Sequence, residues 1–169
     1  MEVTGAAYLY TIAVIGITFI GFSAIVMMLR QTSGQPVERF DILIAHIYME
    51  FGLIVSVGSL LPPLFSFWGL RPETVWRLSS ALAGAALLLF SLTYRRRRLK
   101  ALGEPLPWYT KTNIAVIVLI GVVFVGNACG IAQKEMPAIY LSAITAFMTF
   151  AIASWLRALN IIFLEKSPP

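Results

Sequence analysis

The sequence contains very little of what metal proteins and redox enzymes depend on. Its 169 residues include one cysteine, one histidine and only 12% charged residues. A single cysteine excludes an intrachain disulfide and a Cys-x-x-Cys redox pair, and a single histidine excludes a bis-histidine haem or a multi-histidine metal site within one chain. A glycine-rich phosphate loop and a nucleophile-elbow motif are also missing. The sequence therefore predicts no resident metal or cofactor and argues against an enzyme.

Apolar residues dominate instead. They make up 59% of the chain without counting glycine, and the mean hydropathy is +0.82, whereas soluble domains are about 45 to 50% apolar with glycine included. About 20 consecutive apolar residues cross a bilayer as a helix. We therefore predict an all-α integral membrane protein, a five-transmembrane-helix bundle that forms a single membrane domain over residues 1–169. The predicted spans cover residues 6–29, 42–61, 75–94, 112–132 and 137–164.

Proline and basic residues set the expected ends of these spans. Pro62 and Pro63 are expected to end the second span, because proline lacks a backbone donor and clashes with the preceding turn. The basic run 95–100 is expected to stop the third span and begin a connector. The first span is expected to be retained, because Met1–Thr4 carries no Lys or Arg and the apolar run is longer than a signal-peptide core.

Lysine and arginine are unevenly distributed between the two sides of the predicted bundle. With the N-terminus outside, the cytoplasmic side receives Arg30, Arg39, Arg95, Arg96, Arg97, Arg98, Lys100, Lys111 and Lys166, and the outer side receives Arg71, Arg77 and Lys134. Because basic residues near span ends favour the cytoplasm, we predict an outside N-terminus and a cytoplasmic C-terminus in the cell (inner) membrane. The basic run 95–100 is expected to anchor the third span and contact anionic lipids at the cytoplasmic face.

Two predicted spans carry strongly polar residues on one helical face. His46 and Glu50 lie four residues apart in the second span, and Arg157 and Asn160 lie three apart in the fifth. Counted from the cytoplasmic ends at about 1.5 Å per residue, Glu50 and Arg157 both lie roughly 10 to 12 Å deep. An unpaired charge in the membrane costs about 2.5 to 3.5 kcal/mol. We therefore predict a Glu50–Arg157 ion pair flanked by His46 and Asn160.

This polar cluster has a structural and a functional interpretation. A buried pair can simply hold helices in register, which suits a non-catalytic structural or assembly subunit of a membrane complex. His46 beside a carboxylate can instead change charge near neutral pH, which suits a small ion or proton channel or transporter that moves ions or binds a polar ligand. A less favoured alternative is a lipid-modifying enzyme of the inner leaflet that uses His46 and Glu50 as acid and base.

Small residues indicate where the helices pack in lipid. Gly126 and Gly130 form a GxxxG pattern in the fourth span. Asn127 lies within it and is expected to hydrogen-bond between helices or, as the alternative, to contact a ligand. The lipid bilayer is the expected partner, with a second copy or a membrane partner protein as further candidates. Nucleic acid is not expected, because the pI of 9.7 arises from basic residues at span ends.

Overall fold

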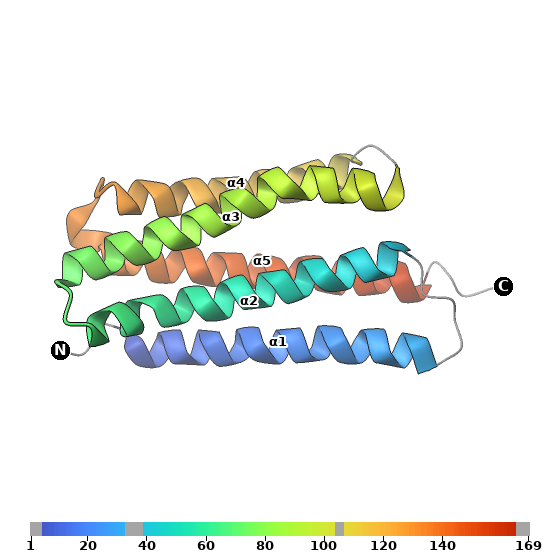
Figure 1. Cartoon of the computed structure of the whole chain (residues 1–169), viewed down its shortest axis with the longest axis horizontal. Helices are drawn as coiled ribbons and strands as arrows, with labels where there is room; N and C mark the ends of the chain where they lie inside the picture. Colours follow the sequence, from blue (N-terminus) through green and yellow to red (C-terminus); the bar gives the residue numbers. More distant parts are fainter. Residues whose placement is uncertain (1–4, 33–38, 104–106, 165–169) are drawn as a thin grey trace.

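Five long helices run back and forth along one axis in the computed structural model of the protein (Figure 1). The structure describes residues 5–32, 39–103 and 107–164, so Met1–Thr4 and Lys166, which the sequence analysis uses, lie outside the described residues. The helices are α1 (Ala6–Thr32), α2 (Arg39–Phe67), α3 (Pro72–Leu102), α4 (Trp108–Ala128) and α5 (Met136–Leu164), with a short 3-10 helix η1 (Gln133–Glu135) before α5.

All regular structure within the described part of the chain is helical, and five helices there are long and apolar enough to cross a membrane. The predicted all-α fold is thereby confirmed, with five helices long and apolar enough to be the predicted spans. Large aliphatic side chains such as Val14, Leu89, Leu92 and Leu119 are exposed on the outside of the bundle. Such a surface is typical of helices that face lipid, because lipid tails are as apolar as leucine. The architecture is compatible with a multi-pass membrane protein.

Successive helices run antiparallel, and α5 occupies the centre. It contacts α1, α2, α3 and α4, whereas α1 and α4 lie at opposite sides of the bundle in Figure 1. The end of the bundle that gathers the last turns of α1, α3 and α5 and the first turns of α2 and α4 is called the basic end, because the run 95–100 lies there. The opposite end is called the far end.

Aromatic side chains fill the middle of the bundle. The ring centre of Phe51 on α2 lies 4.9 Å from that of Phe90 on α3 and 5.3 Å from that of Phe147 on α5. Nearer the far end, the rings of Phe124 and Tyr140 meet edge to face at 5.2 Å. Phe124, Tyr140 and Phe147 are fully buried. Van der Waals contact of this kind is a main source of helix association in lipid, so these rings hold four of the helices together.

Glycine allows α1 and α2 to approach closely. A Cβ atom added to Gly52 would lie 2.8 Å from the carbonyl oxygen of Gly16, and one added to Gly16 would lie 3.0 Å from the carbonyl oxygen of Gly52. Ser56, one turn further along α2, donates its hydroxyl to the carbonyl oxygen of Ala13 on α1 at 3.2 Å. Small residues at helix interfaces in membranes permit such backbone contact. This contact fixes the peripheral helix α1 to α2.

The prediction that Pro62 and Pro63 end the second helix is wrong, because α2 continues through both prolines to Phe67. Pro62 cannot donate the backbone hydrogen bond that the carbonyl of Gly58 would otherwise accept. The hydroxyl of Tyr140 on α5 donates to that carbonyl oxygen at 2.6 Å. A side chain from another helix thus replaces the missing donor, and no pattern within α2 announces it.

The predicted ends of the third and fourth spans also differ from the structure. α3 continues past Tyr94 to Leu102 and closes at Gly103, which has φ +68 and donates its N–H to the carbonyl oxygen of Leu99. Arginine and lysine are good helix formers, so the basic run ends the apolar segment without ending the helix. α4 begins at Trp108, before the predicted start, and ends at Ala128. The basic run therefore lies on a helix rather than in a connector.

Candidate functional site

A cavity of about 90 Å³ lies at the basic end between α2, α3, α4 and α5, and is called the basic-end cavity. Its deeper wall is apolar and includes Ile47, Phe51, Phe90 and Ile117. None of the described residues that line it is acidic. A space of this size holds several water molecules or a small polyatomic anion. Its polar lining consists of Tyr48, Tyr94, Arg98, Tyr109, Thr110, Asn113, Ser154 and Arg157.

Arg98 is the buried member of the basic run. It is 6% exposed, whereas the other four basic residues of the run are exposed. The helical repeat explains this difference, because Arg98 follows Phe90 and Tyr94 at four-residue steps on the buried face of α3. Its Nε is buried and has no hydrogen-bond partner among the residues that the structure describes. A buried cation without a counter-charge is costly, and none of the described residues that line the cavity supplies one, so this side chain favours an anion in the cavity.

Arg157 lies at the rim of the same cavity, on the last turns of α5. Its guanidinium carbon lies 5.6 Å from the centre of the Tyr109 ring at the start of α4, which is within the range of a cation–π interaction. Arg157 is exposed, so this contact bridges α4 and α5 at the edge of the cavity. Asn113 lies one turn beyond Tyr109, and the N-terminus of α4 adds a partial positive charge. Two guanidinium groups and a helix N-terminus therefore make the cavity electropositive.

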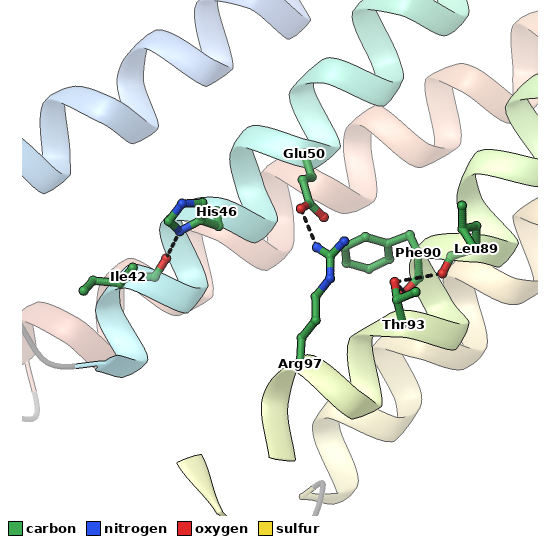
Figure 2. A network of polar contacts seen from close by, with 7 residues as sticks. All are labelled: Ile42, His46, Glu50, Leu89, Phe90, Thr93 and Arg97. Carbon is green, nitrogen blue, oxygen red and sulfur yellow. Dashed lines mark hydrogen bonds and ion pairs between the residues drawn. The ribbon is translucent and has the colours of Figure 1, made fainter. Parts of the chain in front are cut away.

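Glu50 does not pair with Arg157, and that prediction is wrong. Its carboxylate instead accepts a hydrogen bond from Nη1 of Arg97 on α3, with which it forms an ion pair (Figure 2). The neighbours of Glu50 on α2, Ile47 and Phe51, line the cavity, while Glu50 itself lies on the flank that faces α3. Because α3 continues past its predicted end, Arg97 reaches this flank. Equal depth on α2 and α5 therefore does not decide the partner of Glu50.

Two other predicted site residues lie outside the basic-end cavity. His46 is exposed, and its Nδ1 lies 2.8 Å from the carbonyl oxygen of Ile42 on the same helix (Figure 2). Asn160 is exposed on α5 and does not line the cavity. Of the four residues in the predicted cluster, the cavity includes Arg157 alone. Glu50, His46 and Asn160 therefore do not line the cavity with Arg157.

The structure brings Tyr94, Arg98, Tyr109 and Asn113 into the candidate site. By sequence, Arg98 is one of five equivalent basic residues expected at the surface. Tyr94, Tyr109 and Asn113 are not among the predicted site residues. The signal that distinguishes Arg98 is its spacing, because it continues the apolar face of Phe90 and Tyr94 by one further turn. Recognising it requires the third helix to extend beyond Tyr94.

Asn127 lies outside this cavity, toward the far end of α4. It is 2% exposed, and its Nδ2 donates to the hydroxyl of Ser80 on α3 at 2.9 Å and to the carbonyl oxygen of Met136 on α5 at 3.1 Å. Its Oδ1 has no hydrogen-bond partner within the described residues. The two donated bonds join α4 to both neighbouring helices, which is an interhelical role.

The comparisons with known proteins identify no relative: no family model, no curated protein and no solved structure matches this chain. Within the ranges 5–32, 39–103 and 107–164, no group of three or more His, Cys, Asp or Glu side chains is arranged to hold a metal ion. The chemistry of the basic-end cavity must therefore be argued from its own residues.

Proposed function

We propose that this protein is a multi-pass protein of the cell membrane that binds an anionic ligand, a phosphate or a carboxylate, in the basic-end cavity. The observation that carries the proposal is Arg98. Arg98 is buried and lines a cavity with no acidic residue among its described lining residues, and its Nε has no partner among the described residues. Arginine binds phosphate and carboxylate through two parallel hydrogen bonds, and Arg157 supplies a second guanidinium group at the rim.

The proposed orientation puts the basic end at the cytoplasmic surface, with the N-terminus of the chain outside and the C-terminus in the cytoplasm. It is supported by the distribution of lysine and arginine among the connectors. The exposed members of the basic run, Arg95, Arg96, Arg97 and Lys100, then face the anionic headgroups of the inner leaflet. Each contributes about 1 kcal/mol of attraction near such a surface. These residues gather anionic ligands near the cavity, and Arg98 binds one of them.

Ligand binding suits this geometry better than a pore through one chain. Beyond the cavity, toward the far end, Val55, Leu87 and Phe124 are fully buried, and Phe51 packs against the Phe147 ring. These side chains would give no polar partner to an ion that crossed them and lost its hydration. The Glu50–Arg157 pair, on which the channel interpretation depended, is not formed, because Glu50 pairs with Arg97. We therefore favour a binding protein over the channel that the polar cluster suggested.

Lipid binding to the purified protein tests this proposal. Native mass spectrometry in an uncharged detergent compares dioleoyl phosphatidic acid, which is anionic, with dioleoyl phosphatidylcholine, which carries no net charge. We expect preferential binding of phosphatidic acid. We also expect Arg98→Gln to weaken that binding by about tenfold or more, because it removes a charge-assisted hydrogen bond from a buried site.

Arg96→Gln is the matched control for Arg98→Gln. Arg96 carries the same charge on the same helix but is exposed, so solvent and salt screen its interaction with the ligand. Its substitution should have a clearly smaller effect. Equal weakening by both variants, each with wild-type helicity in circular dichroism, would show that surface charge alone attracts the lipid and would overturn the proposed site.

A further inference from the structure

A groove on α5 adjoins the basic-end cavity. It lies between α1 and α5, has a volume of about 820 Å³ and includes Tyr8 on its α1 side. Phe150 lines both this groove and the basic-end cavity. A second groove of about 470 Å³, between α4 and α5, shares Ser142 and Ala146 with the first. The two grooves therefore form one trough along the outer face of α5, which we call the α5 trough.

Small side chains form the floor of the α5 trough. Ser142, Ala146, Thr149 and Ala153 are exposed and follow one another at steps of three or four residues, which places them on one helical face. Arg157, at the rim of the cavity, continues the same row by one turn. A row of small residues is by itself only a packing surface. What distinguishes this row is that it leads to a cavity lined by Arg98, whose buried Nε has no hydrogen-bond partner among the described residues.

The α5 trough is longer than one membrane leaflet. The rise of an α-helix is about 1.5 Å per residue, so the trough extends about 22 Å from Ala153 to Ala138. Half of a hydrocarbon core of about 30 Å is about 15 Å. An acyl chain attached to a headgroup at Arg98 and Arg157 can thus pass Phe150 and follow the trough toward the bilayer centre. A free anion would contact only the cavity.

We propose that the ligand of the basic-end cavity is an anionic lipid, with its headgroup between Arg98 and Arg157 and one acyl chain in the α5 trough. This inference rests on the proposed function, because it concerns the same cavity. The chain gains little net attraction from the trough, since the surrounding lipid tails are equally apolar. The role of the trough is steric, because it lets the headgroup reach Arg98 while the chain stays in apolar surroundings.

Filling the trough with a large side chain tests this inference. Ala153→Trp places an indole ring next to Phe150 on the trough floor. We expect it to weaken binding of dioleoyl phosphatidic acid by about tenfold, which is the size of effect that steric overlap in a packed site produces. Ala85→Trp is the matched control, because Ala85 is exposed on α3 and lines neither the cavity nor the two grooves; it should bind as the wild type does.

Ala146→Trp fills the trough one turn below Phe150 and keeps the test valid if Ala153→Trp does not fold. We expect the same direction of effect from both. Wild-type binding of phosphatidic acid by either folded tryptophan variant would remove the acyl chain from the trough and overturn this inference. The proposed anion site would stand, provided that Arg98→Gln still weakens the binding.

Glycerol 3-phosphate, which has the headgroup without the chains, separates a lipid from a free anion. Its binding is followed through the rise in unfolding temperature that a ligand of the folded state causes. We expect weaker binding than for phosphatidic acid, lost in Arg98→Gln and retained in Ala153→Trp. Tighter binding of glycerol 3-phosphate than of phosphatidic acid would overturn the lipid as the ligand. Retention of both ligands by Arg98→Gln would overturn the proposed function itself.

Discussion

Asn127, toward the far end of the bundle, and Arg98, at the basic end, are similarly buried but differ in their partners. The amide of Asn127 donates to atoms of α3 and α5, whereas Nε of Arg98 has no partner among the described residues and lies beside a cavity. Hydrogen bonds to protein atoms make Asn127 a link between helices. The lack of such bonds leaves Arg98 available to a ligand. Partners rather than burial therefore distinguish a structural polar residue from the proposed binding residue in this bundle.

The largest effect on stability is expected at Asn127. Asn127→Ala removes two donated hydrogen bonds and should lower the free energy of unfolding by about 1 to 2 kcal/mol, measured by denaturation in detergent. Asn113→Ala is the control, because Asn113 is an amide on the same helix that lines the cavity; its change should stay below about 0.5 kcal/mol. An equal loss in both variants would contradict the difference between the two ends.

Arg98 should show the opposite sign. In ligand-free detergent, Arg98→Met keeps the aliphatic stem and removes a buried charge, so the free energy of unfolding should rise by about 1 kcal/mol. Arg96→Met, at an exposed position, should change it by less than about 0.5 kcal/mol. Phosphatidic acid should then stabilise the wild type more than Arg98→Met. A clear loss of stability in ligand-free Arg98→Met would mean that the guanidinium group has a stabilising protein partner, against the structure.

The Glu50–Arg97 pair provides an intermediate case, a charge with a protein partner but little burial. Its side chains are 35% and 47% exposed, so screening should keep their coupling near about 0.5 kcal/mol. A double-mutant cycle of Glu50→Gln with Arg97→Gln measures this coupling. The parallel cycle of Glu50→Gln with Arg157→Gln should give a coupling near zero. Stronger coupling to Arg157 than to Arg97 would restore the pairing that depth alone predicts.

Hydropathy predicts the helices of this protein well because each of them is long and apolar along most of its length. Five helices, their order and their antiparallel course follow from the apolar segments alone. Helix ends follow less well. Considered locally, Pro62 and the basic run are each expected to end a helix. The Tyr140 hydroxyl replaces the hydrogen-bond donor that is missing at Pro62, and the helix-forming arginines allow α3 to continue through the basic run.

The candidate site was predictable only in part, because a site depends on how each helix is rotated against its neighbours. Depth along the bilayer normal placed Arg157 correctly near the basic end but gave it the wrong partner. The rotation of α2 that points Ile47 and Phe51 inward also directs Glu50 to α3. Burial of Arg98 follows from an apolar face that continues into a charged segment. The composition of the basic run does not distinguish the buried Arg98 from the four exposed basic residues around it.

The bond between Tyr140 and Gly58 also bears on the order in which the bundle is assembled. Synthesis brings Gly58 to the membrane 82 residues before Tyr140. Until α5 inserts, the Gly58 carbonyl lacks the donor that Pro62 removes, and such a group is unfavourable in hydrocarbon. The last third of α2 therefore reaches its final stability only when the last helix is in place. The C-terminal helix completes the second one, and a chain truncated before it would leave α2 unfinished.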